Sequence, residues 1–283
     1  MHPPAALLLL HPAARIALSE FTVHPSTVIG LVGLGALYHW RARNAPSPES
    51  PTTGQRATFF GALALIFLSL NGWLHDLSDY YLFSAHMIQH LVLTLVAPPL
   101  LILGTPGWML RPALRWPVVR SVGPRVTTAP MCFAIFTVVL AAWHLPPVYN
   151  LAMAHHNIHI VQHLCFMVAA TFMWWPVLSP LPELPRVSYP AQMLYLFLLS
   201  IPMSLIAICI GYSDHILYPA YSSAPRVWGI TPLQDQLIGA LIMWVPGGLF
   251  FFVIISVVFF KWQQVDGEDS TASAQVGWRV AAR

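Results

Sequence analysis

The chain carries the stretch HMIQHLVLT at residues 86–94 and, further along, HIVQHLCFM at residues 159–167. Both stretches read His-x-x-Gln-His-Leu and continue into an apolar segment. Residues four positions apart share one face of an α-helix, so each stretch places two imidazoles on one face, one helical turn apart. The pattern therefore predicts two apolar helices, each with a histidine pair near its start.

The composition places these helices in a membrane. Hydrophobic residues make up 57% of the 283 residues and charged residues only 8%, whereas roughly 25% of the residues of a soluble domain are charged. Long apolar runs with so little charge are typical of a polytopic membrane protein, whose surroundings are the lipid bilayer. No basic stripe with interleaved aromatic residues is present, so we expect no nucleic-acid partner.

Apolar runs of about 20 residues predict an all-α membrane protein of about seven transmembrane helices. An outer tail, residues 1–20, precedes this transmembrane domain of residues 21–262, and a polar tail, residues 263–283, follows it. Pro98 and Pro99 predict a kink in the third span, because proline removes a helical hydrogen bond. The predicted spans are Phe21–Trp40, Ala57–Leu74, Leu82–Leu103, Thr128–Leu145, Asn157–Leu178, Pro190–Tyr212 and Leu237–Trp262.

The distribution of Lys and Arg predicts the orientation of the spans. Eleven of the thirteen basic residues fall in the loops of one side or in the C-terminal tail, and only Arg15 and Arg226 fall on the other side. Because cytoplasmic loops carry the excess of Lys and Arg, we expect the N-terminus outside and the C-terminus, with its polar tail, in the cytoplasm. Twelve of the thirteen histidines then lie on the outer side, and His39 lies at the inner face.

Histidines within apolar spans point to a metal site. Ionisable side chains inside a bilayer are expensive and are usually functional. The neutral imidazole is the form that binds metals, and it suits copper, zinc, iron and nickel. If the two helices lie side by side, the four imidazoles of the two pairs converge just below the outer surface. Gln89 and Gln162 neighbour the pairs and are candidate hydrogen-bond partners of the imidazoles.

The similarity between the two stretches extends upstream. The first is preceded by Trp73, His75 and Tyr80, and the second by Trp143, His144 and Tyr149. The chain therefore reads as built partly from a repeated two-helix hairpin whose copies run in the same direction. A third, diverged copy would bring an acidic residue, Asp235, near the position of the second histidine. The candidate metal ligands are His75, His86, His90, His144, His156, His159, His163 and Asp235.

Four segments carry a specific combination of motifs: HMIQH followed by Pro-Pro in the same span, WHLPPVYNLA (143–152), HIVQHLCFMVAATFMWWPVLSP (159–180) and WGITPLQDQLIGALIMWVPGG (228–248). Together they resemble the CtaG family of multi-span cytochrome c oxidase assembly factors over nearly all of residues 57–262. The resemblance implies an assembly factor rather than an enzyme, working on a haem–copper oxidase in the inner (plasma) membrane of a bacterium. It also implies an oxidase subunit and other assembly factors as partners and a role in delivering copper. That the histidines bind this copper is inferred from the residues and not from the resemblance.

The outward-facing histidines fit the delivery of copper as Cu(I). The chain lacks the paired cysteines of tight copper carriers, and nitrogen ligands would release the ion more readily. Other functions stay open. Two histidines on facing helices could clamp a haem b iron in an electron-transfer protein. The histidine pairs could also hold two metals of a membrane oxygenase, or the chain could be an assembly scaffold that binds no metal.

Overall fold

The computed structural model describes residues 21–45, 49–226 and 228–281, with residues 268–281 as backbone alone. The predicted tail of residues 1–20 lies outside this part of the chain. The described residues form helices and no strand, which confirms the all-α prediction. The elements are α2 (Pro25–Arg43), α3 (Thr53–Leu70), α4 (Gly72–Tyr80), α5 (Phe83–Leu91), η1 (Val92–Val96), α6 (Ala97–Gly104), α7 (Gly107–Leu110), η2 (Arg111–Arg115), α8 (Pro117–Val126), α9 (Ala129–His144), α10 (Pro146–Ala154), α11 (His156–Leu178), α12 (Tyr189–Gly211), η3 (Pro219–Tyr221) and α13 (Pro232–Ala281).

The structure has several helices that suit a membrane. Within the described residues, five segments are long and apolar enough to cross one: Thr53–Leu70, Phe83–Gly104, His156–Leu178, Tyr189–Gly211 and Pro232–Gly267. The pair α8 and α9 would add a sixth as one span bent by 87°. Helix α2 covers most of the first predicted span but is not among these segments, because its last turns carry His39, Arg41 and Arg43. A multi-pass membrane protein is therefore confirmed, with five to six candidate spans.

The repeated unit is longer than the predicted two-helix hairpin. A nine-residue helix, α4, stands between α3 and α5, and α10, of the same length, stands between α9 and α11. A helix of nine residues is too short to cross a bilayer, so the search for long apolar runs passed over both. His75 lies within α4, whereas His144 ends α9, so these two upstream histidines occupy different places in the two copies.

A π-helical turn, η1, separates α5 from α6 just before the two prolines of this span. Because Pro98 has no N–H, the carbonyl of Thr94 lacks its usual helical donor. The indole N–H of Trp174 on α11 donates to that carbonyl instead, at 2.9 Å. The predicted irregularity of the third span therefore also ties it to α11, so that the two helices with the histidine pairs are joined by a buried hydrogen bond.

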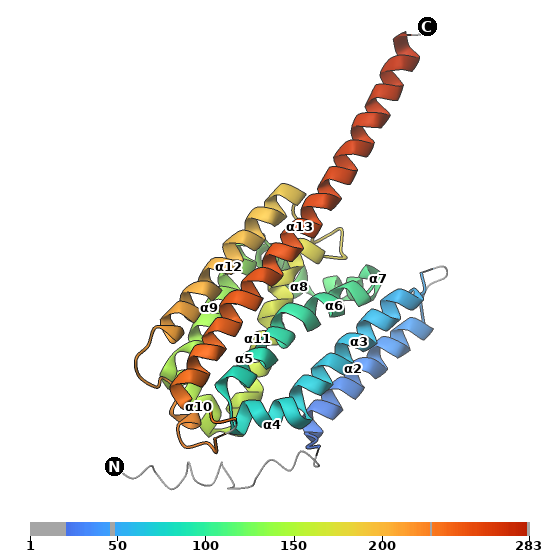
Figure 1. Cartoon of the computed structure of the whole chain (residues 1–283). Helices are drawn as coiled ribbons and strands as arrows, with labels where there is room; N and C mark the ends of the chain where they lie inside the picture. The colour runs from blue at the N-terminus through green and yellow to red at the C-terminus, as the bar shows by residue number, and fades with distance from the viewer. Residues whose placement is uncertain (1–20, 46–48, 227, 282–283) are drawn as a thin grey trace.

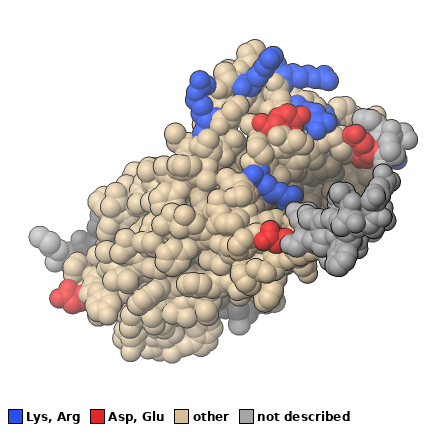
Figure 2. Space-filling model, turned by 90° about the horizontal axis from the view of Figure 1, so that it is seen from above, with Lys and Arg blue, Asp and Glu red and all other residues tan. Residues whose placement is uncertain are grey.

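The long helices run up and down between two ends of the molecule (Figure 1). The loop before α3, the segment α7–α8 and the loop between α11 and α12 lie at one end, which we call the arginine end. Figure 2 looks down on this end and shows Lys and Arg side chains there; Arg41, Arg111, Arg115 and Arg120 line a hollow in it. Helices α4 and α10 lie at the opposite end, the histidine end, with the first turns of α5, α11 and α13.

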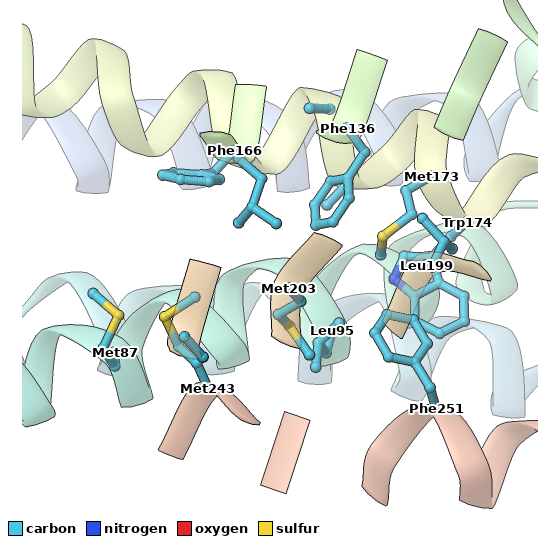
Figure 3. Close-up of a cluster of buried hydrophobic side chains, with 14 of the residues drawn as sticks. Met87, Leu95, Phe136, Phe166, Met173, Trp174, Leu199, Met203, Met243 and Phe251 are labelled. Carbon is cyan, nitrogen blue, oxygen red and sulfur yellow. The ribbon is translucent and has the colours of Figure 1, made fainter. Parts of the chain in front are cut away.

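Large apolar side chains fill the centre of the bundle. Figure 3 shows Met87, Phe136, Phe166, Trp174, Met203, Met243 and Phe251 in this core, each at most 3% exposed. Gly239 lets α13 approach α5 closely, since a Cβ at this position would stand 2.4 Å from Cδ1 of Phe83. Packing of this density leaves little freedom to the first turns of α5, which carry His86 and His90.

Candidate metal centre

Five imidazoles meet at the histidine end of the bundle, and we refer to them as the imidazole cluster. They come from α5 (His86, His90), the end of α9 (His144) and α11 (His159, His163), and all are at most 7% exposed. The ring centroids lie 4.1 Å apart within the α5 pair and 4.4 Å apart within the α11 pair. Across the helices, the distances are 5.5 Å for His86 and His159 and 5.4 Å for His90 and His163. The two copies of the repeat thus bring both histidine pairs together.

Many ring nitrogens of the imidazole cluster have no hydrogen-bond partner in the described part of the chain. They are both nitrogens of His86, both nitrogens of His90, Nε2 of His144 and Nδ1 of His163. Leaving a buried polar group unpaired costs about 1–3 kcal/mol, and most buried polar groups of folded proteins have a partner. Each neutral imidazole carries one N–H and one lone pair, so four lone pairs without partners gather here. A metal site accounts for such a group.

His144 is prepared for such a role by the backbone of its own helix. Its Nδ1 lies 2.7 Å from the carbonyl oxygen of Leu140. A carbonyl oxygen only accepts hydrogen bonds, so the proton of the neutral ring is on Nδ1 and the lone pair is on the buried Nε2. Metal-binding histidines commonly have this arrangement, in which one ring nitrogen donates to an oxygen and the other binds the ion.

A carboxylate faces the cluster at His159. Oδ2 of Asp79 lies 3.3 Å from Nδ1 of His159, and Nε2 of His159 lies 2.8 Å from Nε2 of His163. When Nδ1 of His159 donates to the carboxylate, its Nε2 is left with a lone pair that faces the second imidazole. Asp79, His86 and His159 each offer a ligand atom, and these three atoms lie within 4.8 Å of one another.

Asp79 is the residue that the sequence-based ligand set lacks. It lies on α4, and the hydroxyl of Ser78 donates to its Oδ1 at 2.9 Å. Burial raises the pKa of the Asp79 carboxyl, but the neighbouring imidazoles of His159 and His75 outweigh burial and hold this pKa below its usual range. The group therefore adds a negative charge beside the imidazoles. Its spacing from His75, four positions along one helix, is the signal that could have revealed it.

His75 has both ring nitrogens engaged. The side-chain amide nitrogen of Gln89 donates to the carbonyl of Ser69 at 2.6 Å and lies 3.1 Å from Nδ1 of His75. Nδ1 therefore accepts, and the proton on Nε2 faces Oδ2 of Asp79 at 3.4 Å. Burial lowers the pKa of His75, which favours this neutral ring. His75 thus orients the carboxylate, and Gln89 is a hydrogen-bond partner of the site, as its position beside the histidine pair suggested.

Two more candidates lie away from the imidazole cluster. His156 is exposed at the start of α11, with its ring centroid 5.8 Å from that of His24. The carboxylate of Asp235 on α13 accepts hydrogen bonds from the backbone N–H groups of Phe83 and Ser84, at 2.6 Å and 3.1 Å, and from the Ser84 hydroxyl. A carboxylate suits this place because the first N–H groups of a helix lack partners within it. Asp235 therefore fixes the start of α5.

The ring of Phe166 occupies the space beside the cluster. Its centroid lies 4.6 Å from that of His90 and 5.9 Å from that of His144. A porphyrin clamped between two imidazoles needs an open slot at this depth, and the buried Phe166 side chain fills that position. The three close ligand atoms of Asp79, His86 and His159 suit a single transition-metal ion better.

Long apolar helices that enclose a buried group of imidazoles define a multi-pass membrane protein with a candidate metal site. The chain belongs to the Caa3_CtaG family, the cytochrome c oxidase caa3 assembly factors, which it matches over residues 31–264. It is also 23% identical over 224 residues to an uncharacterized protein of Mycobacterium leprae and 23% identical over 222 residues to one of Mycobacterium bovis. Each match covers 73% of this chain and 33% of the relative, so the chain spans about one third of those relatives. No solved structure matches the chain significantly.

Proposed function

We propose that this protein is an assembly factor of a haem–copper oxidase that binds copper in the imidazole cluster and passes it to the oxidase. The observation that carries the proposal is the set of buried ring nitrogens of His86, His90, His144 and His163 that lack a partner among the described residues. Family membership supports the oxidase as the recipient. Copper is a cargo in this proposal, so the protein carries out no catalytic step of its own.

The proposed ligands suit an ion that must leave again. Asp79, His86 and His159 would hold the copper, because their ligand atoms lie within 4.8 Å of one another. The remaining imidazoles of the cluster stand beside this group and would take the ion over as it moves. No cysteine belongs to the cluster; Cys132 is buried elsewhere in the core. Thiolates are the soft ligands that hold Cu(I) most tightly. A site of imidazoles holds the ion less tightly and therefore releases it to the oxidase more readily.

The proposal includes an orientation in the bacterial plasma membrane. Excess Lys and Arg mark the cytoplasmic side of a membrane protein, so the arginine end would face the cytoplasm and the histidine end the outside. Seven spans, with α2 as the first and α9 as the fourth, would then put the N-terminus outside and the C-terminus inside. In this orientation copper reaches the cluster from the outer side, and an oxidase subunit, with other assembly factors, docks in the same membrane.

The metal content of the purified protein tests the proposal. We would load the full chain with Cu(I) in mild detergent and measure bound metal by mass spectrometry together with the visible spectrum. The test variant changes His86, His90, His159 and His163 to Ala. The control changes the exposed histidines His39, His155 and His215, and circular dichroism compares the folding of all three proteins.

We expect about one copper per chain in the wild type and in the control, and its loss in the test variant. A Soret band in the wild type would replace the copper proposal with a haem protein. A wild type that binds no copper after loading would leave the histidines as helix-packing groups and the protein as a scaffold.

A further inference from the structure

A cavity of about 510 Å³ lies between α2, α3, α6 and α11, next to the imidazole cluster. Most of its wall is apolar, with residues such as Leu31, Leu34 and Ile66. The polar groups on the wall are mainly imidazoles, those of His24, His75, His156, His159 and His163. His159 and His163 belong to the imidazole cluster as well, so the cavity adjoins the proposed copper site directly. We refer to it as the access cavity.

His24 is held in place by the backbone around it. Its N–H donates to Oδ1 of Asn71 at 2.7 Å, and the Asn71 amide in turn donates to the carbonyl of Phe67 at 2.8 Å. The N–H of Gly72 donates to the carbonyl of Thr22 at 2.8 Å. These contacts attach the segment before α2 to the junction of α3 and α4, so the backbone that carries the His24 ring has a defined position.

The His24 ring stands between solvent and the buried histidines. Its centroid lies 5.8 Å from that of the exposed His156 and 4.4 Å from that of the buried His75. Nε2 of His24 is buried and has no hydrogen-bond partner among the described residues. From there, the centroid of His75 is 6.3 Å from that of His159 in the imidazole cluster. The ring nitrogens of His75 are both engaged, so it packs against the route without being a ligand in it. His24 and His156 at the surface and His159 and His163 of the cluster all line the same cavity.

We propose that the access cavity is the route by which copper enters, and that His24 and His156 form its first binding pair. The inference rests on the proposed function and adds to it a second, outer metal site. The ion would exchange ligands along the wall, from His156 and His24 to His159 and His163, without a change of charge or oxidation state. The other possible ligands on the wall are the Met167 thioether and the hydroxyls of Ser26, Thr27 and Thr171. None of them is an imidazole, so removing the first pair slows the route.

The rate of copper uptake tests this route separately from copper affinity. We would follow the loading of the metal-free full chain with Cu(I) in time, and also measure the final copper content. The test variants are His24→Ala, His156→Ala and the double variant, and the control is His155→Ala, the exposed neighbour of His156. We expect uptake to slow by about tenfold or more in the double variant, while its final copper content stays that of the wild type. The control variant should match the wild type in both uptake rate and final content.

A second pair of variants narrows the cavity without touching a histidine. Gly30 lines the access cavity, and a Cβ there meets no atom within 4 Å, so the side chain of Gly30→Phe starts in open space and occupies part of the cavity. Gly33 is equally free of neighbours within 4 Å but does not line the cavity, so Gly33→Phe is the matched control. We expect slow uptake in Gly30→Phe and normal uptake in Gly33→Phe.

The outcomes separate the two proposals. Equal uptake rates in the double variant and in His155→Ala would overturn the route while leaving the proposed function intact. A lower final copper content at an unchanged rate would make His24 and His156 ligands of the final site and would also overturn the route. A wild type that takes up no copper at all would instead contradict the proposed function.

Discussion

At the scale of single residues, the imidazoles of the cluster differ in what holds their protons. The carbonyl of Leu140 accepts the Nδ1 proton of His144, and the Asp79 carboxylate faces Nδ1 of His159. Each contact keeps a proton on one nitrogen and leaves a lone pair on the other. That lone pair has no partner in His144, whereas in His159 it lies 2.8 Å from Nε2 of His163. Asp79 also supplies the negative charge that offsets the charge of a bound cation in a buried site.

The charge of Asp79 gives the first prediction. Asp79→Asn keeps the size of the side chain and an acceptor for Ser78, but it removes the negative charge and one ligand atom. We expect Cu(I) affinity, measured by competition with a chromogenic chelator, to fall by about tenfold or more. Asp76→Asn is the control, because Asp76 lies on the same helix but accepts a hydrogen bond from the Thr22 hydroxyl and does not face the imidazole cluster. Equal affinities in the two variants would remove Asp79 from the site.

The two glutamines next to the histidine pairs give a second prediction, about stability. Gln89 donates to Ser69 and His75, and its Oε1 lies 3.1 Å from the Ser78 hydroxyl. Neither side-chain polar atom of the buried Gln162 has a partner among the described residues. We expect Gln89→Leu to lower the free energy of unfolding by about 1–3 kcal/mol. Gln162→Leu should be neutral or stabilising. Thermal unfolding midpoints in detergent, compared without metal, check both; an equal loss in the two variants would contradict the assignment.

The histidine pairs could be predicted from the sequence because their four-residue spacing puts both rings on one helix face. The roles of Asp79 and Gln89 depend on contacts between α4 and its neighbours, which no spacing encodes. Asp235 was predicted as a ligand from its place in a diverged copy of the repeat, but its carboxylate is bonded to the start of α5. Local patterns thus identify which residues are functional, whereas their partners require the packing of the helices.

At the scale of elements, the π-helical turn η1 is the irregular part of the span that carries His86 and His90. It ends just before Pro98 and Pro99. The carbonyl of Thr94 accepts a hydrogen bond from the indole N–H of Trp174 instead of from a helical N–H. The Thr94 hydroxyl donates in turn to the carbonyl of His90 at 2.7 Å. The backbone of His90 is therefore connected through one threonine to α11, which carries the other histidine pair.

This connection gives a third prediction. Trp174→Phe keeps most of the packing but removes the donor, which leaves the buried Thr94 carbonyl without its partner. We expect a loss of about 1–3 kcal/mol in the free energy of unfolding and weaker Cu(I) binding. Trp175→Phe is the control, since that indole donates to Leu184 near the arginine end, at 3.1 Å. The control should lose stability without losing copper affinity, and a parallel loss of affinity would disprove the special role of Trp174.

At the scale of the whole molecule, the long helices could be predicted because an apolar run of about 20 residues indicates a transmembrane helix. The spans from residue 57 onward agree with the helices to within a few residues, apart from α13, which starts at Pro232 and continues to Ala281. Helices α4 and α10 were missed since nine-residue helices leave no long apolar run. They cover the histidine end, and α4 carries Asp79 into the site.

The orientation of the molecule gives the fourth prediction. Phosphatase reporters, which are active only outside the cytoplasm, would be fused after Tyr212 and after Trp262. We expect activity from the first fusion and none from the second, because Lys and Arg gather at the arginine end. A fluorescent protein that folds only in the cytoplasm should give the opposite pattern at the two sites. Phosphatase activity of the fusion after Trp262 would show the opposite orientation, in which the imidazole cluster lies on the cytoplasmic side.

His159 belongs to both the wall of the access cavity and the imidazole cluster. When its Nε2 binds an ion in the cluster, that nitrogen is no longer available to the cavity. A second ion would then find fewer nitrogen atoms on the wall and would bind there more weakly. If copper is the cargo as proposed, this sharing limits uptake to one ion at a time, and the next ion binds after the first has been passed on.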